Sequence, residues 1–229
     1  MMDFEALERK NKIEADPFTD TVFSWSLEDI SNETLYKDKV ERIPETFKSA
    51  NHYLGSFVYP LLEETRAEVC SSMDALYKAP FAHVTSFEES KPRGTRVYDI
   101  GVDYWRNRFN RSSKELYKTL PGDLLVLTNV KPETSSDLER AGTSWAFLSV
   151  TKITEDEDDD DSTSTYFKVR ASKDSELETE MHNSLFVIFL VNITSQKRVW
   201  KALRMQRNVK ILNDVLSVDS AVSLLMLYI

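Results

Sequence analysis

The sequence has few of the residues that build covalent or metal-based sites. It holds one cysteine, Cys70, among 229 residues, which excludes an intramolecular disulfide and a multi-cysteine metal site. A lone cysteine is typical of a chain from a reducing compartment. The three histidines, His52, His83 and His182, lie far apart and show no ligand spacing. We therefore expect this chain to bind no metal and no other cofactor.

Glycine is also scarce, and its placement argues against nucleotide binding. The five glycines form neither G-x-x-x-x-G-K-[ST] nor G-x-G-x-x-G, the two patterns whose backbone amides cradle phosphates. A nucleophile elbow, G-x-S-x-G, is missing from the sequence as well. We therefore expect the chain alone not to hydrolyse ATP and not to be an enzyme.

Long apolar runs are missing. The longest, Leu185–Val191 and Ala221–Ile229, are far shorter than the roughly 20 residues that span a bilayer as a helix. Met1–Asp20 is charged throughout and does not resemble a signal peptide. These features predict a soluble intracellular protein, nuclear or cytoplasmic, with no membrane partner.

The net charge of −9 is concentrated in one segment. Seven acidic residues stand together in Glu155–Asp161, and removing their charges takes the formal net charge from −9 to −2. Adjacent like charges repel and are costly to bury, so this run predicts a solvated loop. The rest of the chain is close to neutral.

Short segments of strand character fill the middle of the chain. The turn Pro121-Gly122-Asp123 precedes a brief apolar run, Leu124–Leu127, which is typical of a buried central strand. A bulge is expected near Gly101, in the second strand. The predicted strands cover residues 81–87, 95–104, 124–127, 143–153, 165–171 and 185–193. Six strands separated by polar loops suit a small closed antiparallel β-barrel.

Helical patterns flank these strands. Ser26 and Asp29 are spaced as a capping box for a short helix. Pro44 is expected to start the longest helical pattern, which Tyr59-Pro60 interrupts and which then resumes to Tyr77. Along it, four side chains are predicted to face solvent: Glu63, Glu64, Arg66 and Glu68. A last helix, capped by Thr194 or Ser195, is expected to reach about Leu216.

These patterns predict an α+β fold, a barrel of about six antiparallel strands flanked by long stalk helices. The expected divisions are a flexible lead (1–21), a helical stalk (22–78), the barrel with its acidic loop 155–161 (79–193), and a returning helix with an apolar tail (194–229). The helices could also simply pack against a sheet without forming a stalk.

Two basic stretches could contact nucleic acid, because cations track phosphates and aromatic rings stack on bases. The first interleaves arginines with aromatic residues between Lys91 and Lys118, and the second forms one stripe on the last helix. The candidate residues are Arg93, Arg96, Tyr104, Trp105, Arg106, Arg108, Arg111, Lys197, Lys201, Arg204 and Arg207. The alternatives are surface cations over an aromatic core for the first stretch and a solvated face for the second.

Four segments resemble the region ahead of the motor in plant senataxin-like helicases of superfamily 1. They are Phe47–Met73, Tyr117–Leu127, Trp145–Ile153 and Ser184–Leu203, and the likeness extends roughly over Val22–Ile211. In those proteins this region is similar to a β-barrel on stalk helices, placed before or on the first motor lobe. The chain reaches Ile229 without any helicase motif, so no catalytic residue is carried over.

The resemblance implies a non-catalytic accessory domain that contacts RNA or single-stranded DNA beside a helicase motor, in cis or in trans. ATP and Mg²⁺ are implied only for a full-length relative, which would unwind nucleic acid. The alternative is a protein–protein interaction module without a nucleic-acid role, acting through the stalk and the apolar tail Ala221–Ile229.

Overall fold

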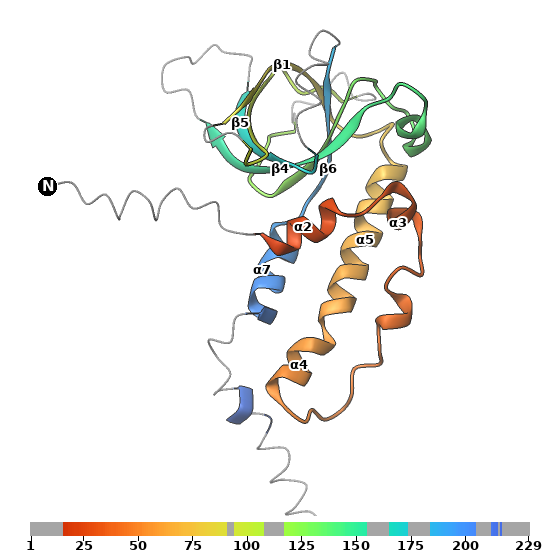
Figure 1. The fold of residues 1–229 in the computed structure, drawn as a ribbon, viewed down its shortest axis with the longest axis vertical. Coiled ribbons are helices and arrows are strands. Elements are labelled where there is room, and N and C mark those ends of the chain that lie inside the picture. The colour runs from red at the N-terminus through yellow and green to blue at the C-terminus, as the bar shows by residue number, and fades with distance from the viewer. Residues whose placement is uncertain are drawn as a thin grey trace, which may run out of the picture.

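The chain builds a six-stranded barrel above a group of helices (Figure 1). The computed structural model describes residues 16–90, 94–107, 117–154, 165–173, 184–204, 212–214 and 216. The described strands are β1 (Phe81–Glu89), β2 (Val97–Val102), β3 (Asp123–Thr128), β4 (Trp145–Thr154), β5 (Thr165–Ala171) and β6 (Phe186–Asn192). The described α-helices are α2 (Pro17–Phe23), α3 (Leu27–Ser31), α4 (Ala50–Ser56), α5 (Val58–Asp74) and α7 (Thr194–Arg204), and the 3₁₀ helices are η1 (Lys37–Lys39) and η2 (Ser135–Glu139).

The six strands form a closed barrel in the order β1-β2-β5-β4-β3-β6. Every neighbouring pair is antiparallel, including β1 with β6, which closes the sheet. Closure leaves no unpaired strand edge. The predicted α+β class with an antiparallel barrel of six strands is confirmed.

Strand β3 is buried on both faces, as its apolar run predicted. Successive side chains of a strand point to opposite sides of the sheet. Leu125 and Leu127 belong to the cluster inside the barrel, together with Leu148 and Val169. Leu124 and Val126 belong to a second cluster shared with the helices, whose other members include Phe18, Leu62, Val69, Met73 and Trp200. The wall of the barrel therefore separates two cores.

The pairing of β1 with β2 contains the irregularity predicted near Gly101. Val84 pairs with Val102 and Ser86 with Gly101, so Thr85 is an extra residue on β1. The bulge thus lies on the strand that faces Gly101. A side chain at Gly101 would overlap the Ser86 hydroxyl and the Tyr166 ring, which explains the glycine.

The helix predicted from Pro44 starts later, and this prediction was wrong. Helix α4 begins at Ala50, because the Ser49 side chain accepts a hydrogen bond from His52 N and caps the first turn. The helical pattern is interrupted at Phe57, which separates α4 from α5. Pro60 then stands in the first turn of α5, where its missing N–H costs no helical hydrogen bond.

Arg66 on α5 is buried, which corrects the prediction that it faces solvent. Its guanidinium donates to both Glu63 carboxylate oxygens, at 3.0 and 2.7 Å, and to the Ile30 carbonyl. These partners satisfy the charge and place it at the end of α3, where helix carbonyls attract cations. Glu64 and Glu68 are exposed as predicted.

Helices α3, α7 and α2 complete the helical group, in which α2 packs against α7. The capping box at Ser26 and Asp29 is present in α3, as predicted. Helix α7 begins at Thr194, directly after β6, and packs beside α5 (Figure 1). Helix α2 packs on α7 through Phe18, whose ring centroid lies 5.5 Å from that of Trp200. The predicted continuation of the last helix beyond Arg204 falls largely outside the described residues.

The interior of the barrel should dominate its stability. Replacing Leu125, which is fully buried, by alanine removes apolar contacts and leaves a cavity. We expect Leu125→Ala to lower the free energy of unfolding by about 2–5 kcal/mol. Urea unfolding followed by tryptophan fluorescence measures this. The control is Leu120→Ala, an exposed leucine just before β3, for which a change of no more than about 0.5 kcal/mol is expected.

The turn before β3 should also depend on its glycine. Gly122 has φ of +88° and Gly142 has φ of +83°, but an added methyl group would overlap the Thr194 hydroxyl only at Gly122. We expect Gly142→Ala to cost about 1–2 kcal/mol from the backbone alone. Gly122→Ala should cost roughly 1–3 kcal/mol more because of crowding. Equal losses in urea unfolding would contradict the close approach of the turn to α7.

Candidate functional site

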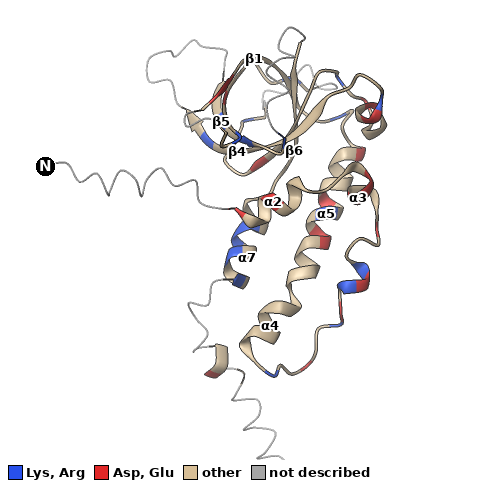
Figure 2. Ribbon diagram, viewed as in Figure 1, with Lys and Arg blue, Asp and Glu red and all other residues tan. Residues whose placement is uncertain are grey.

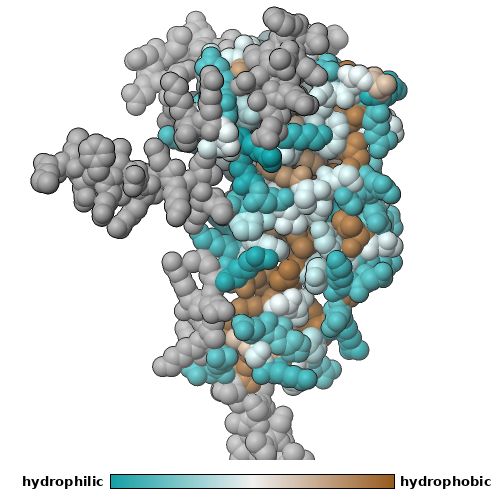
Figure 3. Space-filling view, in the orientation of Figure 1, coloured by the Kyte–Doolittle hydropathy of each residue, from teal (hydrophilic) through white to brown (hydrophobic). Residues whose placement is uncertain are grey.

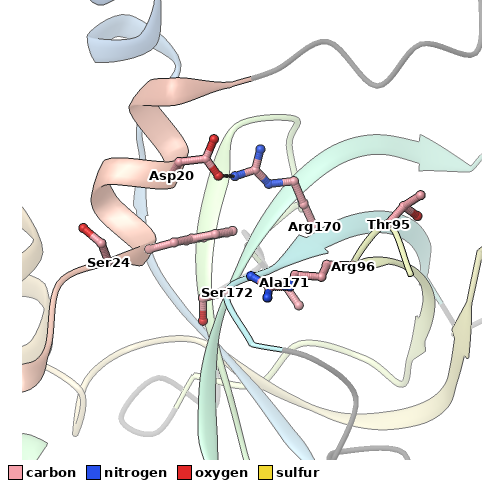
Figure 4. A pocket seen from close by; sticks show the side chains of 8 residues that line it. Asp20, Ser24, Thr95, Arg96, Arg170, Ala171 and Ser172 are labelled. Carbon is pink, nitrogen blue, oxygen red and sulfur yellow. Dashed lines mark hydrogen bonds and ion pairs between the residues drawn. The ribbon is translucent and has the colours of Figure 1, made fainter. Parts of the chain in front are cut away.

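A groove lined largely by charged and hydroxyl-bearing residues lies between α2 and the barrel wall formed by β2, β4 and β5. It consists of two adjoining hollows of about 350 and 270 Å³ that share Arg170. The first is lined by residues of α2, of β5 and of the segment before β2 (Figure 4). The second is lined by Asp16, Thr19, Val97, Ser149, Thr151, Lys168, Arg170 and Lys197. Cations and hydroxyl groups predominate, which suits an anionic ligand.

The alternation of β5 explains why its cations reach this groove. Phe167, Val169 and Ala171 are buried in the barrel, so Lys168 and Arg170 lie on the outer face. Arg170 stands opposite Val97 of β2 and Ser149 of β4, and both of these also line the groove. The register of three strands thus sets the position of the guanidinium.

Arg96 enters the same groove with an unusual backbone. It is the non-glycine residue with positive φ, 56°, in the part of the chain that the structure describes. This conformation is costly for a residue with a side chain and is enriched at functional sites. The Arg96 carbonyl accepts a hydrogen bond from Ala171 N at 2.9 Å, which ties it to the end of β5. The conformation places Arg96 beside Arg170 in the lining of the hollow.

Helix α7 supplies the fourth cation of the groove and a basic face beyond it. Lys197 Nζ lies 2.8 Å from an Asp16 carboxylate oxygen and 3.4 Å from Ser149 Oγ. Further along, Arg198, Lys201 and Arg204 are exposed, and Arg204 lies over the Trp200 ring at 4.2 Å. Residues 194–204 contain no acidic side chain. Figure 2 shows the blue segments of ribbon that these residues form along α7 and near β4 and β5.

Acidic side chains balance most of the charge in the groove. Asp16 and Asp20, both from the α2 segment, form ion pairs with Lys197 and Arg170. Lys168 forms a third pair with Asp99 at 2.7 Å. Lys168, Arg170 and Lys197 are thus each held by a carboxylate. Burial acts to raise the pKa of Asp99, but hydrogen bonds from Lys168 and Ser90 outweigh it, so the pKa lies below its ordinary value.

The structure separates the residues predicted to bind nucleic acid. Arg96 and Lys197 lie in the groove, and Lys201 and Arg204 continue from it along α7. Tyr104 and Arg106 follow the other end of β2 from Arg96. There the Arg106 guanidinium stacks on the exposed Tyr104 ring at 3.9 Å and pairs with Asp103 at 2.6 Å.

Trp105 has a different environment from the other candidates. Its side chain is buried in the barrel cluster, where Nε1 donates to Thr119 Oγ1 at 3.0 Å. The ring contacts Tyr117 edge to face, with centroids 4.5 Å apart. It therefore has no exposed face on which a base could stack. Arg93, Arg108, Arg111 and Arg207 lie outside the described residues.

Sequence reasoning missed Lys168, Arg170 and the acids that face them. The signal was available in Thr165–Ala171, where two cations occur two residues apart in a segment with strand alternation. Two cations on one face of a barrel strand indicate an outer charged surface. The acids of α2 had no such signal, because their position depends on tertiary packing.

The chain belongs to the family described as Domain of unknown function (DUF6469), whose model matches residues 14–223. No curated protein matches the chain. Among the described residues, no helix combines the length and apolar character needed to cross a bilayer. The same residues contain no group of three or more His, Cys, Asp or Glu side chains placed to hold a metal ion.

The carboxylate of Asp16 should stabilise the fold in a pH-dependent way. It caps α2 by accepting from Thr19 N at 3.0 Å and pairs with Lys197. Burial acts to raise its pKa, but the hydrogen bonds from Lys197 and Thr19 outweigh it and lower the pKa. A lowered pKa means that this stabilisation is complete above the ordinary aspartate pKa of about 3.9 and is lost as the pH falls through the folded-state value.

We therefore expect Asp16→Ala to cost about 0.5–2 kcal/mol of unfolding free energy at pH 7 and progressively less toward pH 3. Asp16→Asn keeps a capping oxygen and loses the charge, so it should cost less than alanine at pH 7. Urea unfolding at a series of pH values measures both. A cost for Asp16→Ala that is constant from pH 7 to pH 3 would contradict the assigned role.

Proposed function

We propose that this domain contacts single-stranded nucleic acid, RNA or DNA, as a non-catalytic accessory domain of a senataxin-like helicase. The groove under α2 would hold phosphates of the strand, and the basic face of α7 would extend the contact. ATP and Mg²⁺ would act on the motor of a longer relative or a partner. This role fits a nuclear or cytoplasmic protein without a membrane partner.

One observation supports the proposal most directly. Arg96, Lys168, Arg170 and Lys197 come from three separate parts of the chain and converge on two adjoining hollows. Ser149, Thr19 and Thr151 line the same surface, and the hydroxyls of the two threonines donate to Asp16 and to the Lys168 carbonyl. Lysine and arginine side chains are the groups that most often hold phosphate oxygens in protein–nucleic acid contacts. The second support is the row of basic side chains along α7 next to Lys197.

Stacking would come from rings other than Trp105. Phe23 of α2 lines the first hollow, and its ring centroid lies 5.2 Å from the Arg170 guanidinium. Tyr104, which is exposed beneath Arg106, offers a second ring at the far end of β2. Both positions combine a cation with an aromatic surface, the pairing that binds single strands with little sequence preference.

A second candidate function is protein–protein interaction through the stalk. Figure 3 shows brown, apolar surface in the helical half of the molecule. Exposed large hydrophobic residues there include Ile43 and Tyr59 in the α3–α5 region and Val199 on α7. Exposed apolar surface is typical of a contact site. The apolar tail 221–229, which suggested this role, lies outside the described residues.

Binding of labelled single-stranded RNA across a salt series tests the nucleic-acid proposal. We expect binding at low salt, with log K falling by about 0.7 per phosphate contact for each unit of log salt concentration. The groove variant Lys168→Gln/Arg170→Gln and the helix variant Lys201→Gln/Arg204→Gln should each bind more weakly and reduce that slope by about 0.7 to 1.4.

Two further variants sharpen the result. Arg140→Gln neutralises an exposed arginine that pairs with the largely buried Asp137, away from the groove, and should bind like the unchanged chain. Arg106→Gln/Arg108→Gln/Arg111→Gln tests the first basic stretch separately from the groove. Absence of RNA binding at low salt, or equal losses in the groove variant and Arg140→Gln, would overturn the proposal and leave the stalk as the candidate surface.

A further inference from the structure

The Arg170–Asp20 ion pair joins two side chains of very different exposure. The side chain of Arg170 is only 14% exposed, because it lies between the barrel wall and α2. The side chain of Asp20 is 63% exposed, and its carboxylate meets the guanidinium at the mouth of the first hollow (Figure 4). The cation is thus fixed by its surroundings, whereas the anion is not.

Helix α2 itself is firmly attached. Phe18 and Val22 are buried against the helices and the barrel wall, and Asp16 ties the start of α2 to Lys197. Asp20 lies on the opposite side of this short helix from its buried side chains. A change of side-chain rotamer can therefore withdraw the Asp20 carboxylate from Arg170 while α2 remains in place.

The hollow holds the groups that a phosphate would need once the carboxylate has moved. The Arg170 guanidinium presents a fork of N–H donors, and Phe23 lies behind it. Arg96, Thr95, Ser24 and Ser172 line the same space of about 350 Å³. A guanidinium binds phosphate and carboxylate oxygens with the same two-pronged geometry, so the two anions compete for one position.

We propose that Asp20 is a built-in competitor for a phosphate-binding position on Arg170. Binding of a nucleic-acid strand replaces the Asp20 carboxylate at Arg170 by a phosphodiester group. This inference rests on the proposed function, since it assigns the regulation of the same groove. A lone phosphate carries no advantage over a carboxylate that is already in place, whereas a strand also contacts Lys168, Lys197 and α7. The exchange therefore favours polyanions over small anions.

The test compares Asp20→Asn with the unchanged chain in binding of labelled single-stranded RNA at low salt. We expect Asp20→Asn to bind about two- to fivefold more tightly, the range that corresponds to loss of one exposed ion pair. The matched control is Asp38→Asn, an exposed acid in η1 with the same change of net charge, which should bind like the unchanged chain. Thermal unfolding checks that both variants fold.

A double-mutant cycle makes the assignment specific to Arg170. Arg170→Gln should weaken binding, and Asp20→Asn/Arg170→Gln should bind no more tightly than Arg170→Gln alone, because the competed position is gone. A gain from Asp20→Asn that persists without Arg170, or an equal gain from Asp38→Asn, would overturn the inference while the proposed function stands. If the unchanged chain and Asp20→Asn both fail to bind RNA, the inference and the proposed function fall together.

Discussion

Leu124 and Leu125 are neighbours in the chain, yet they pack into different cores. The alternation of β3 directs Leu125 into the barrel and Leu124 toward the helices, and the same strand pairs with β4 and β6. Because one strand serves both clusters, the barrel and the helices do not form independently packed layers. The position of α2 against the barrel, and with it the groove, depends on this shared wall.

The groove combines rigid and adjustable parts in a way that follows from this wall. Strand register fixes Lys168 and Arg170, and the backbone tie between Arg96 and Ala171 fixes the third cation. Two of the three acids, Asp16 and Asp20, instead come from the N-cap and the body of α2, whereas Asp99 belongs to β2. Lys168 and Arg170 are therefore part of the barrel, whereas the carboxylates that pair with Arg170 and Lys197 come from an added element.

Much of the barrel could be predicted from the sequence, because each strand carries its own short-range signal. Alternation in Thr165–Ala171 and the turn at Gly122 both identify strands without knowledge of their partners. The helix start was misplaced at Pro44 because proline is favourable in a first helical turn, and the N-cap at Ser49 was not considered. Arg66 was misplaced because a buried cation with satisfied partners looks, in sequence, like a surface residue.

The candidate site was less predictable for a physical reason. Arg96 and Arg106 are close in sequence but lie beyond opposite ends of β2. Arg96 and Arg170 are far apart in sequence but line the same hollow. Trp105 illustrates the same problem, since an aromatic residue between cations suits both a stacking surface and a core. Composition identifies the types of residue in a site, but strand pairing decides which of them share a surface.

The barrel is inserted in the chain between α5, which ends at Asp74, and α7, which begins at Thr194. These two helices pack side by side. Bringing these helices together without the strands would close a loop of more than a hundred residues, with a corresponding loss of chain entropy. Once β1 has paired with β6, the two helix ends are already neighbours. Pairing of β1 with β6 therefore lowers the chain-entropy cost of packing α5 against α7.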